Sequence, residues 1–221
     1  QRKSKKILIY FFLLLVVGSI NNINFNDLKL QNVNNINIDG LDIEDKLILL
    51  KKINNFNLNN IFFISKSDLI NEIESNSLVE KYFIFKRYPS SIDINIEKTK
   101  FLAKINKNGQ VFYLGSNGKF TKNDFSNNQL PYIFGSPEVI EFFYIKEVID
   151  KSKITYKEIK NLYFYPSRRW DLELRNNIII KLPKDNTNLA LNLAIEFLYD
   201  NEFKDNKVID ARIKNQIILN D

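Results

Sequence analysis

The sequence of 221 residues contains neither cysteine nor histidine. Without thiols it cannot form disulfides, Cys-ligated zinc sites or a thiol nucleophile, and without imidazole it lacks Ser-His-Asp and Cys-His catalytic sets. With only six glycines it also has no G-x-G-x-x-G phosphate loop. Methionine is absent, so we expect the natural chain to begin before Gln1. These absences argue against most enzyme classes, and we expect no cofactor, no metal and no small-molecule substrate.

Positive charge is concentrated at the start of the chain. Residues 1–6 hold four basic residues and no acidic one, which leaves 28 of the 32 basic residues to face 26 acidic ones. A nucleic-acid-binding domain needs a basic face on its folded body rather than a basic tip. We therefore expect no nucleic-acid partner.

A run of 14 residues without charge, Ile7–Ile20, follows the basic tip. As a helix it would span ~21 Å, less than the ~30 Å of a hydrocarbon layer. An uncleaved anchor, a cleaved signal peptide and a buried globular helix are the three interpretations. Because Lys5 and Lys6 can extend toward the lipid headgroups, we favour an anchor over residues 7–25, with the tip in the cytoplasm and the bulk exported. The anchor residues would include Ile7, Phe12, Leu15 and Gly18.

Residues 31–98 carry signals of both helices and strands. Ile92, Ile94 and Ile96 alternate with polar residues, which is the pattern of a half-buried strand. A helix is expected to begin near Asp42, because an aspartate can cap a helix. Its inward face is expected to consist of Ile43, Leu47 and Leu50. The expected order of elements is strand, helix, helix, strand, strand.

Residues 99–221 contain many turn signals. Asn108-Gly109 predicts a tight hairpin, since both central residues of such a turn need positive φ. Ser136 and Pro137 are expected to begin a helix, with Ser136 as its cap. We expect a mainly antiparallel β-domain with helices packed on it, and a strand at Ile217–Leu219.

Four segments, taken together and in order, resemble the bacterial cell-division family FtsQ, also called DivIB. They are Ile36–Leu41, Arg87–Glu97, Arg168–Leu174 followed by Ile178–Pro183, and Ile209–Arg212. Ala211 departs from the leucine that is usual in the family, and Asn177 stands where a turn glycine is usual.

The resemblance implies an α+β protein with four parts. These are a cytoplasmic tail (1–6), a single transmembrane helix (7–25), a POTRA domain of βααββ order (31–98) and a β-domain (99–221). It also implies a non-enzymatic inner-membrane protein whose bulk lies in the periplasm. Such a protein links early and late division proteins at the septum and binds the small bitopic proteins FtsB and FtsL.

The resemblance further implies that a partner adds a strand along the last edge of the β-domain. The residues concerned are Ile213, Lys214, Asn215, Gln216, Ile217, Ile218 and Leu219. The alternative is that their apolar members only complete the core. Arg168, Arg169 and Trp170 form a second candidate patch, unless Trp170 is a core residue. Tyr88-Pro89 is either a recognition turn or only a tight connection.

Two other functional classes remain open on the sequence alone. One is another POTRA-containing factor for outer-membrane assembly or secretion, although no long C-terminal barrel fits after residue 100. The other is an exported enzyme, for which Asp171 and Glu173 are the only paired acids we considered as an acid–base pair. The midcell scaffold is the interpretation that we favour.

Overall fold

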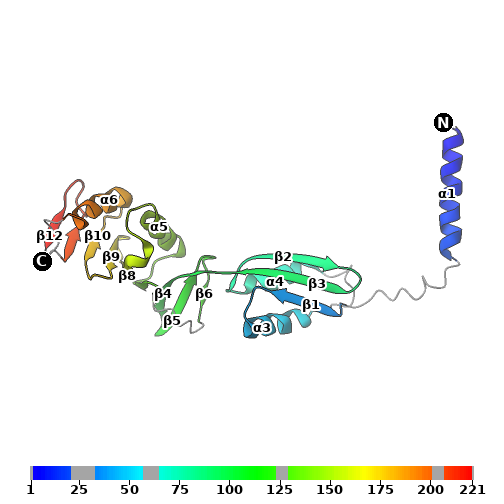
Figure 1. Cartoon of the computed structure of the whole chain (residues 1–221), viewed down its shortest axis with the longest axis horizontal. Helices are drawn as coiled ribbons and strands as arrows, with labels where there is room; N and C mark the ends of the chain where they lie inside the picture. The colour runs from blue at the N-terminus through cyan, green and yellow to red at the C-terminus, as the bar shows by residue number, and fades with distance from the viewer. Residues whose placement is uncertain (1, 21–32, 57–64, 123–128, 201–206, 221) are drawn as a thin grey trace. The chain divides into compact units, whose positions relative to one another are not determined.

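The computed structural model describes residues 2–20, 33–56, 65–122, 129–200 and 207–220. Contacts within the chain divide it into two compact units, residues 1–98 and residues 99–221 (Figure 1). We call them the N-terminal unit and the C-terminal unit, and describe each by itself.

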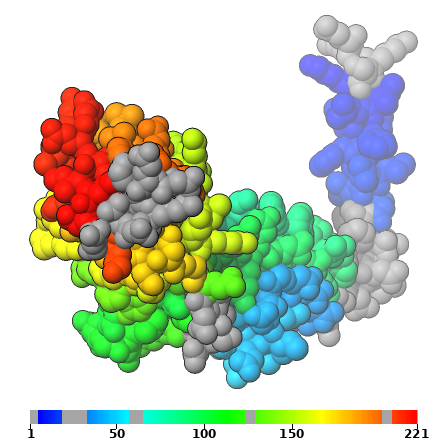
Figure 2. Space-filling model, turned by 60° about the vertical axis from the view of Figure 1, so that its left-hand side comes forward, coloured from blue at the N-terminus to red at the C-terminus, as the bar shows by residue number. Residues whose placement is uncertain are grey.

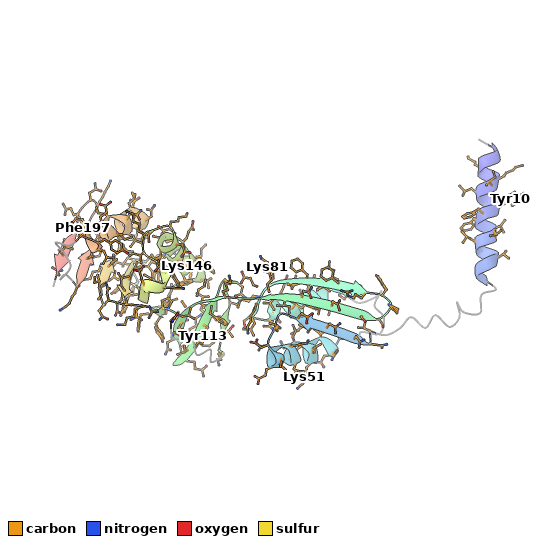
Figure 3. The ribbon with its side chains drawn as sticks, viewed as in Figure 1. Tyr10, Lys51, Lys81, Tyr113, Lys146 and Phe197 are labelled. Carbon is orange, nitrogen blue, oxygen red and sulfur yellow. The ribbon has the colours of Figure 1, made fainter. Side chains whose placement is uncertain are left out.

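Helix α1 (Arg2–Ile20) corrects the expected transmembrane helix over residues 7–25. In the part of the chain that the structure describes, no helix combines the length and the apolar character needed to cross a membrane. The physical reason is that charged residues occupy the first turns of α1, so its uncharged run spans only ~21 Å. Like Tyr10, the expected anchor residues Ile7, Phe12, Leu15 and Gly18 are exposed on α1 (Figure 3). Residues 21–25 lie outside the described residues.

The N-terminal unit also contains two helices packed on a three-stranded sheet. Its elements are β1 (Asn35–Asp39), α3 (Ile43–Asn54), α4 (Lys66–Ser75), β2 (Val79–Arg87) and β3 (Ser91–Lys98). The strand order is β1-β3-β2, with β1 parallel and β2 antiparallel to β3. The sequence predicted this order of helices and strands, and the predicted alternation in β3 is confirmed, since Ile92, Ile94 and Ile96 are all buried.

The buried face of α3 differs from the predicted one. Leu49 and Ile53 are fully buried, whereas Ile43 is 79% exposed and Leu47 is 53% exposed. Leu50 alone of the predicted set packs against the core. The helix carries apolar residues on two stripes, and contacts with α4 and the sheet decide which stripe is buried.

The C-terminal unit is built on one nine-stranded sheet. Its strands are β4 (Phe101–Lys107), β5 (Gln110–Gly115), β6 (Phe120–Thr121), β7 (Tyr132–Phe134), β8 (Ile159–Phe164), β9 (Trp170–Leu174), β10 (Ile179–Lys181), β11 (Val208–Asp210) and β12 (Ile218–Asn220). Its helices are α5 (Val139–Asp150), the 3-10 helix η1 (Tyr156–Glu158) and α6 (Thr187–Leu198). The strand order is β12-β11-β10-β9-β8-β7-β4-β5-β6.

The core of the C-terminal unit lies under α5 and α6. A row of buried apolar residues crosses the sheet at equivalent register positions, from Ile209 through Ile180, Leu172 and Leu162 to Ile133. Phe142 of α5 and Leu191 of α6 belong to the same cluster. Because side chains alternate along each strand, the residues between these positions stand on the opposite face of the sheet.

Local signals in the C-terminal unit were predicted with mixed success. The hairpin at Asn108-Gly109 is confirmed, with φ of 53° and 79° at the two turn residues. The predicted cap Ser136 is wrong, because α5 begins at Val139 with Glu138 as its cap. Glu138 and Glu141 form a capping box, in which the Glu138 backbone N–H donates to the Glu141 carboxylate at 2.8 Å.

Gly135 should be required for the stability of the C-terminal unit. Its φ is 95°, and a Cβ atom there would lie 2.2 Å from the carbonyl oxygen of Phe164. Gly109 has a similar φ of 79° but open space around it. We expect Gly135→Ala to lower the free energy of unfolding by roughly 2 kcal/mol or more, and Gly109→Ala by about 1 kcal/mol.

Denaturant titration followed by the fluorescence of the single tryptophan, Trp170, measures both variants, since Trp170 is buried in this unit. Equal losses for the two substitutions would show that the close approach to Phe164 is not the reason for the glycine.

Candidate protein-binding site

Strand β12 forms one end of the nine-stranded sheet. It pairs with β11 in antiparallel register, Ile209 opposite Leu219, and in the described residues no strand pairs with its other side. The space-filling view shows the C-terminal segment, in red, at the surface (Figure 2). The last strand of the chain is therefore an edge strand, and an edge strand presents unpaired backbone N–H and C=O groups.

The ladder between β10 and β11 decides which backbone groups of β12 point outward. Ile179 N–H donates to the Lys207 carbonyl at 2.8 Å, and Ala211 N–H donates to the Lys181 carbonyl at 2.9 Å. In a parallel ladder with this register, the N–H and C=O of Ile209 both face β10.

Successive residues of a strand direct these groups to opposite sides, so Val208 and Asp210 face β12. They stand opposite Asn220 and Ile218. The N–H and C=O of Leu219, which lies between them, consequently point away from the sheet.

The side chains of this segment alternate between the core and solvent. Ile217 and Leu219 are half-buried and pack against the core of the C-terminal unit, whereas Ile218 is 45% exposed. The segment thus combines both interpretations of the sequence, since its apolar residues complete the core while its backbone edge stays open.

The first four residues of the predicted site form a turn instead of a strand. Gln216 N–H donates to the Ile213 carbonyl at 3.1 Å, and Asn215 has a φ of 56°. Of the two central residues, Lys214 and Asn215, only Asn215 has a positive φ. The strand edge is therefore shorter than Ile213–Leu219, because a tight turn is needed to bring β12 back along β11.

An ion pair fixes the point where β11 ends. Arg212 donates to both carboxylate oxygens of Asp210, with Nε at 2.8 and 3.0 Å and Nη2 at 2.5 Å, and its backbone N–H donates to Oδ1 at 3.1 Å. Hydrogen bonds from Arg212 outweigh burial and lower the pKa of Asp210, while the same contact raises the pKa of Arg212. The pair holds the chain at the start of the turn.

A groove of about 570 Å³ lies beside this turn, between residues 183–193 and 211–215. Leu189, Leu193 and Ile213 supply apolar lining, and Lys184 and Lys214 supply positive charge. The sequence-based predictions did not include this groove, in which Leu189 is 64% exposed. A useful signal was available: Leu189 and Leu193 are four residues apart and share one helix face, while Leu191 and Ala194 are buried on another.

The second candidate patch contains one residue that is not accessible. Trp170 is 3% exposed, and its ring lies 4.8 Å from that of Phe164. Arg168 is exposed and pairs with Glu141 of α5 at 2.7 Å. Arg169 stacks over the ring of Tyr165 at 3.9 Å. Any contact by this patch would be made by the two arginines, since Trp170 belongs to the core.

Tyr88 and Pro89 form the turn between β2 and β3 in the N-terminal unit. The Tyr88 side chain is 60% exposed, and the Tyr88-Pro89 peptide bond is cis. This turn and the β12 edge belong to different units of the chain.

Asp171 and Glu173, the paired acids of β9, have different environments. Glu173 accepts hydrogen bonds from Lys160 at 2.7 Å, Asn161 at 2.8 Å and Tyr163 at 2.7 Å. Burial opposes ionisation, but these donors outweigh it and lower the pKa of Glu173 to about 2. Burial and the hydrogen bond to Glu173 raise the pKa of Tyr163 to about 12. Glu173 is therefore an ionised acceptor at the centre of a structural network.

Asp171 is 2% exposed, and its Oδ1 lies 3.6 Å from Nε of Arg169. Burial raises the pKa of Asp171, although the charge of Arg169 opposes this. In the described part of the chain, no group of three or more acidic residues is placed to hold a metal ion. The geometry assigns both acids to the packing of the sheet.

Glu173→Gln should lower stability in a pH-dependent way. The carboxylate has a pKa of about 2 in the folded protein against an ordinary value of 4.5, so its stabilising contribution is complete above about pH 5 and is lost as the pH falls toward 2. We expect the difference in unfolding free energy between wild type and Glu173→Gln to shrink over that window in denaturant titrations. Glu196→Gln, an exposed position on α6, is the control. A difference that stays constant between pH 7 and pH 3 would contradict this account.

The chain matches the family model described as cell division protein FtsQ/DivIB, C-terminal, over residues 96–212. This range covers more than half of the chain and most of the nine-stranded sheet, and β12 lies beyond its end. A comparison with curated proteins finds no match.

Proteins of this family are non-enzymatic and act at the division septum with other cell-division proteins. The match agrees with the resemblance in the Arg168–Leu174 and Ile209–Arg212 segments, both of which lie within it. The chain belongs to the FtsQ/DivIB family of cell-division proteins.

Proposed function

We propose that this protein is a division-site scaffold that captures a small bitopic division protein of the FtsB or FtsL type on the open edge of β12. The observation that carries the proposal is the orientation of Leu219, whose N–H and C=O point away from the nine-stranded sheet. A partner segment in extended conformation would satisfy both groups by adding a tenth strand.

Several features of the edge support strand addition. Ile217 and Leu219 are anchored in the core, so the backbone that would receive the partner is held in place before binding. Preorganisation of this kind reduces the entropy lost on association. The exposed side chain of Ile218 lies on the opposite face and gives the partner an apolar neighbour.

The groove beside the turn gives the proposed edge a means of selecting its partner. Backbone pairing alone is indifferent to sequence, and specificity in strand addition comes from pockets that receive side chains. The apolar lining from Leu189 and Ile213 suits an apolar side chain of the partner, and Lys184 and Lys214 suit acidic neighbours.

For the N-terminal unit, we propose that residues 33–98 form a POTRA domain. The order β1-α3-α4-β2-β3, with both helices on one face of a three-stranded sheet, supports this proposal. The Tyr88-Pro89 turn would then be an exposed corner of that domain. Its part in the scaffold would be to meet division proteins other than the partner on β12.

Leu219→Pro should strongly weaken partner capture. Proline removes the outward N–H while leaving the two neighbouring residues able to bond β11. Leu219→Ala is the matched control, because it removes the same side chain and keeps the N–H. We expect Leu219→Pro to bind an FtsB-type partner at least about tenfold more weakly than Leu219→Ala in a pull-down titration of the full chain.

A second control separates proline itself from the position of the proline. Ile43→Pro introduces proline at the exposed first position of α3 in the N-terminal unit, after an extended cap residue, and should bind as wild type does. Trp170 fluorescence verifies that each variant is folded. Equal binding by Leu219→Pro and Leu219→Ala, with both folded, would reject backbone pairing at β12.

A further inference from the structure

Helix α3 of the N-terminal unit has an outer face that is apolar and open to solvent. Leu49 and Ile53 bury the inner side of the helix, whereas Leu47 is 53% exposed and Ile48 is 55% exposed. Because successive residues of a helix are about 100° apart, Leu47 and Ile48 flank the line that runs along α3 opposite the buried residues. Ile43, which is 79% exposed, extends the apolar surface by one turn.

Two exposed charged residues lie on the line between Leu47 and Ile48. They are Glu44 in the first turn of α3 and Lys51 in the last, and Figure 3 shows Lys51 on the side of α3 that faces away from the sheet. Seven residues make almost two full turns, so the two side chains point in directions that differ by only about 20°.

Neither of these charges has a partner within its own chain. Glu44 and Lys51 are about 10 Å apart along the helix, beyond the three or four residues at which helical side chains pair. In the described part of the chain neither of them forms an ion pair, whereas the adjacent Lys52 pairs with Glu72 of α4 at 2.8 Å. The outer face of α3 therefore carries one unpaired charge of each sign, on either side of an apolar centre.

We infer that α3 packs against α3 of a second copy of this chain, antiparallel and about a two-fold axis that passes between Leu47 and Ile48. Leu47 then contacts its own counterpart on one side of the seam, and Ile48 contacts its counterpart on the other. Glu44 of each copy lies opposite Lys51 of the other, so both charges gain a partner of opposite sign. The same surface serves on both copies, as two-fold symmetry requires.

Charge selects this arrangement over its competitors, because charged residues beside a helix seam determine the orientation of the two helices. A parallel pair would place each Glu44 beside the other Glu44 and each Lys51 beside the other Lys51. An antiparallel pair shifted by one turn would place either Glu44 or Lys51 opposite the apolar residues of the second copy, without a partner of opposite sign. The inferred arrangement joins the apolar residues and pairs both charges.

The absence of cysteine from the chain permits a test that depends on this geometry. Facing Cα atoms of two helices packed about 9 Å apart are roughly 6 Å from each other, within the span of a disulfide. Full-length Leu47→Cys should therefore form a disulfide-linked dimer under mild oxidation. Asn54→Cys, at an exposed position in the last turn of α3, is the matched control.

The two copies of Asn54 would lie about 20 Å apart along the antiparallel helices, too far for a disulfide. We expect at least about tenfold more dimer from Leu47→Cys than from Asn54→Cys on a non-reducing gel.

Exchange of the charges tests the orientation of the pair. In the Leu47→Cys background, Glu44→Lys should reduce the dimer severalfold, because it brings lysines together across the seam. Adding Lys51→Glu should restore the dimer, because the double exchange rebuilds both opposite-charge pairs. The helix dipole disfavours a lysine in the first turn and a glutamate in the last, so the recovery could not come from a more stable helix.

Three results would overturn the inference. The first is a Leu47→Cys protein that stays monomeric, which would mean that another protein or another part of this chain covers α3. The second is as much dimer from Asn54→Cys as from Leu47→Cys, and the third is a double charge exchange that does not restore the dimer. Leu219→Pro in the C-terminal unit should leave the dimer unchanged, so the fate of this inference is separate from that of the proposed function.

Discussion

The direction of one pair of backbone groups determines what the C-terminal unit can do. The N–H and C=O of Ile209 face β10, so the N–H and C=O of its two neighbours face β12. The backbone groups of Leu219 therefore point outward. No side chain is needed for this result, since it follows from the alternation of backbone groups along an extended chain. If the N–H and C=O of Ile209 faced β12 instead of β10, the backbone groups of Leu219 would bond β11. The backbone groups of Ile218 and Asn220 would then point outward.

The surrounding residues keep that edge in place. The Asp210–Arg212 pair holds the end of β11, and the turn at Asn215 returns the chain along it. Ile217 and Leu219 then attach the last strand to the same core that contains Ile209. The edge is thus open on one side and anchored on the other, which distinguishes it from a frayed terminus.

The sequence could predict those features that depend on neighbouring residues. The Asn108-Gly109 hairpin and the alternation of Ile92, Ile94 and Ile96 are confirmed, because turn geometry and strand periodicity are local. The buried face of α3 was wrong, since two apolar stripes compete and only tertiary contacts choose between them. The transmembrane helix over residues 7–25 was wrong as well. The uncharged run is shorter than a hydrocarbon layer, and this argued against a transmembrane helix. We nevertheless favoured an anchor because of the basic residues that precede the run.

The candidate site shows the same division between local and distant information. The alternation of Ile217, Ile218 and Leu219 was predictable, but the place of β12 at the end of nine strands depends on pairings between distant segments. The spacing of Leu189 and Leu193 places them on one face of α6, but only the tertiary packing decides that this face is exposed while the face of Leu191 is buried. Trp170 was ambiguous for the same reason.

Amide hydrogen exchange at single-residue resolution tests the central claim most directly. The exchange rates of the full chain are compared with and without an FtsB-type partner. The account predicts that the Leu219 amide, open in the free protein, exchanges at least about tenfold more slowly in the complex, while Ile218 and Asn220, already facing β11, change much less. A complex that forms with the Leu219 amide still exchanging at its free rate would contradict it.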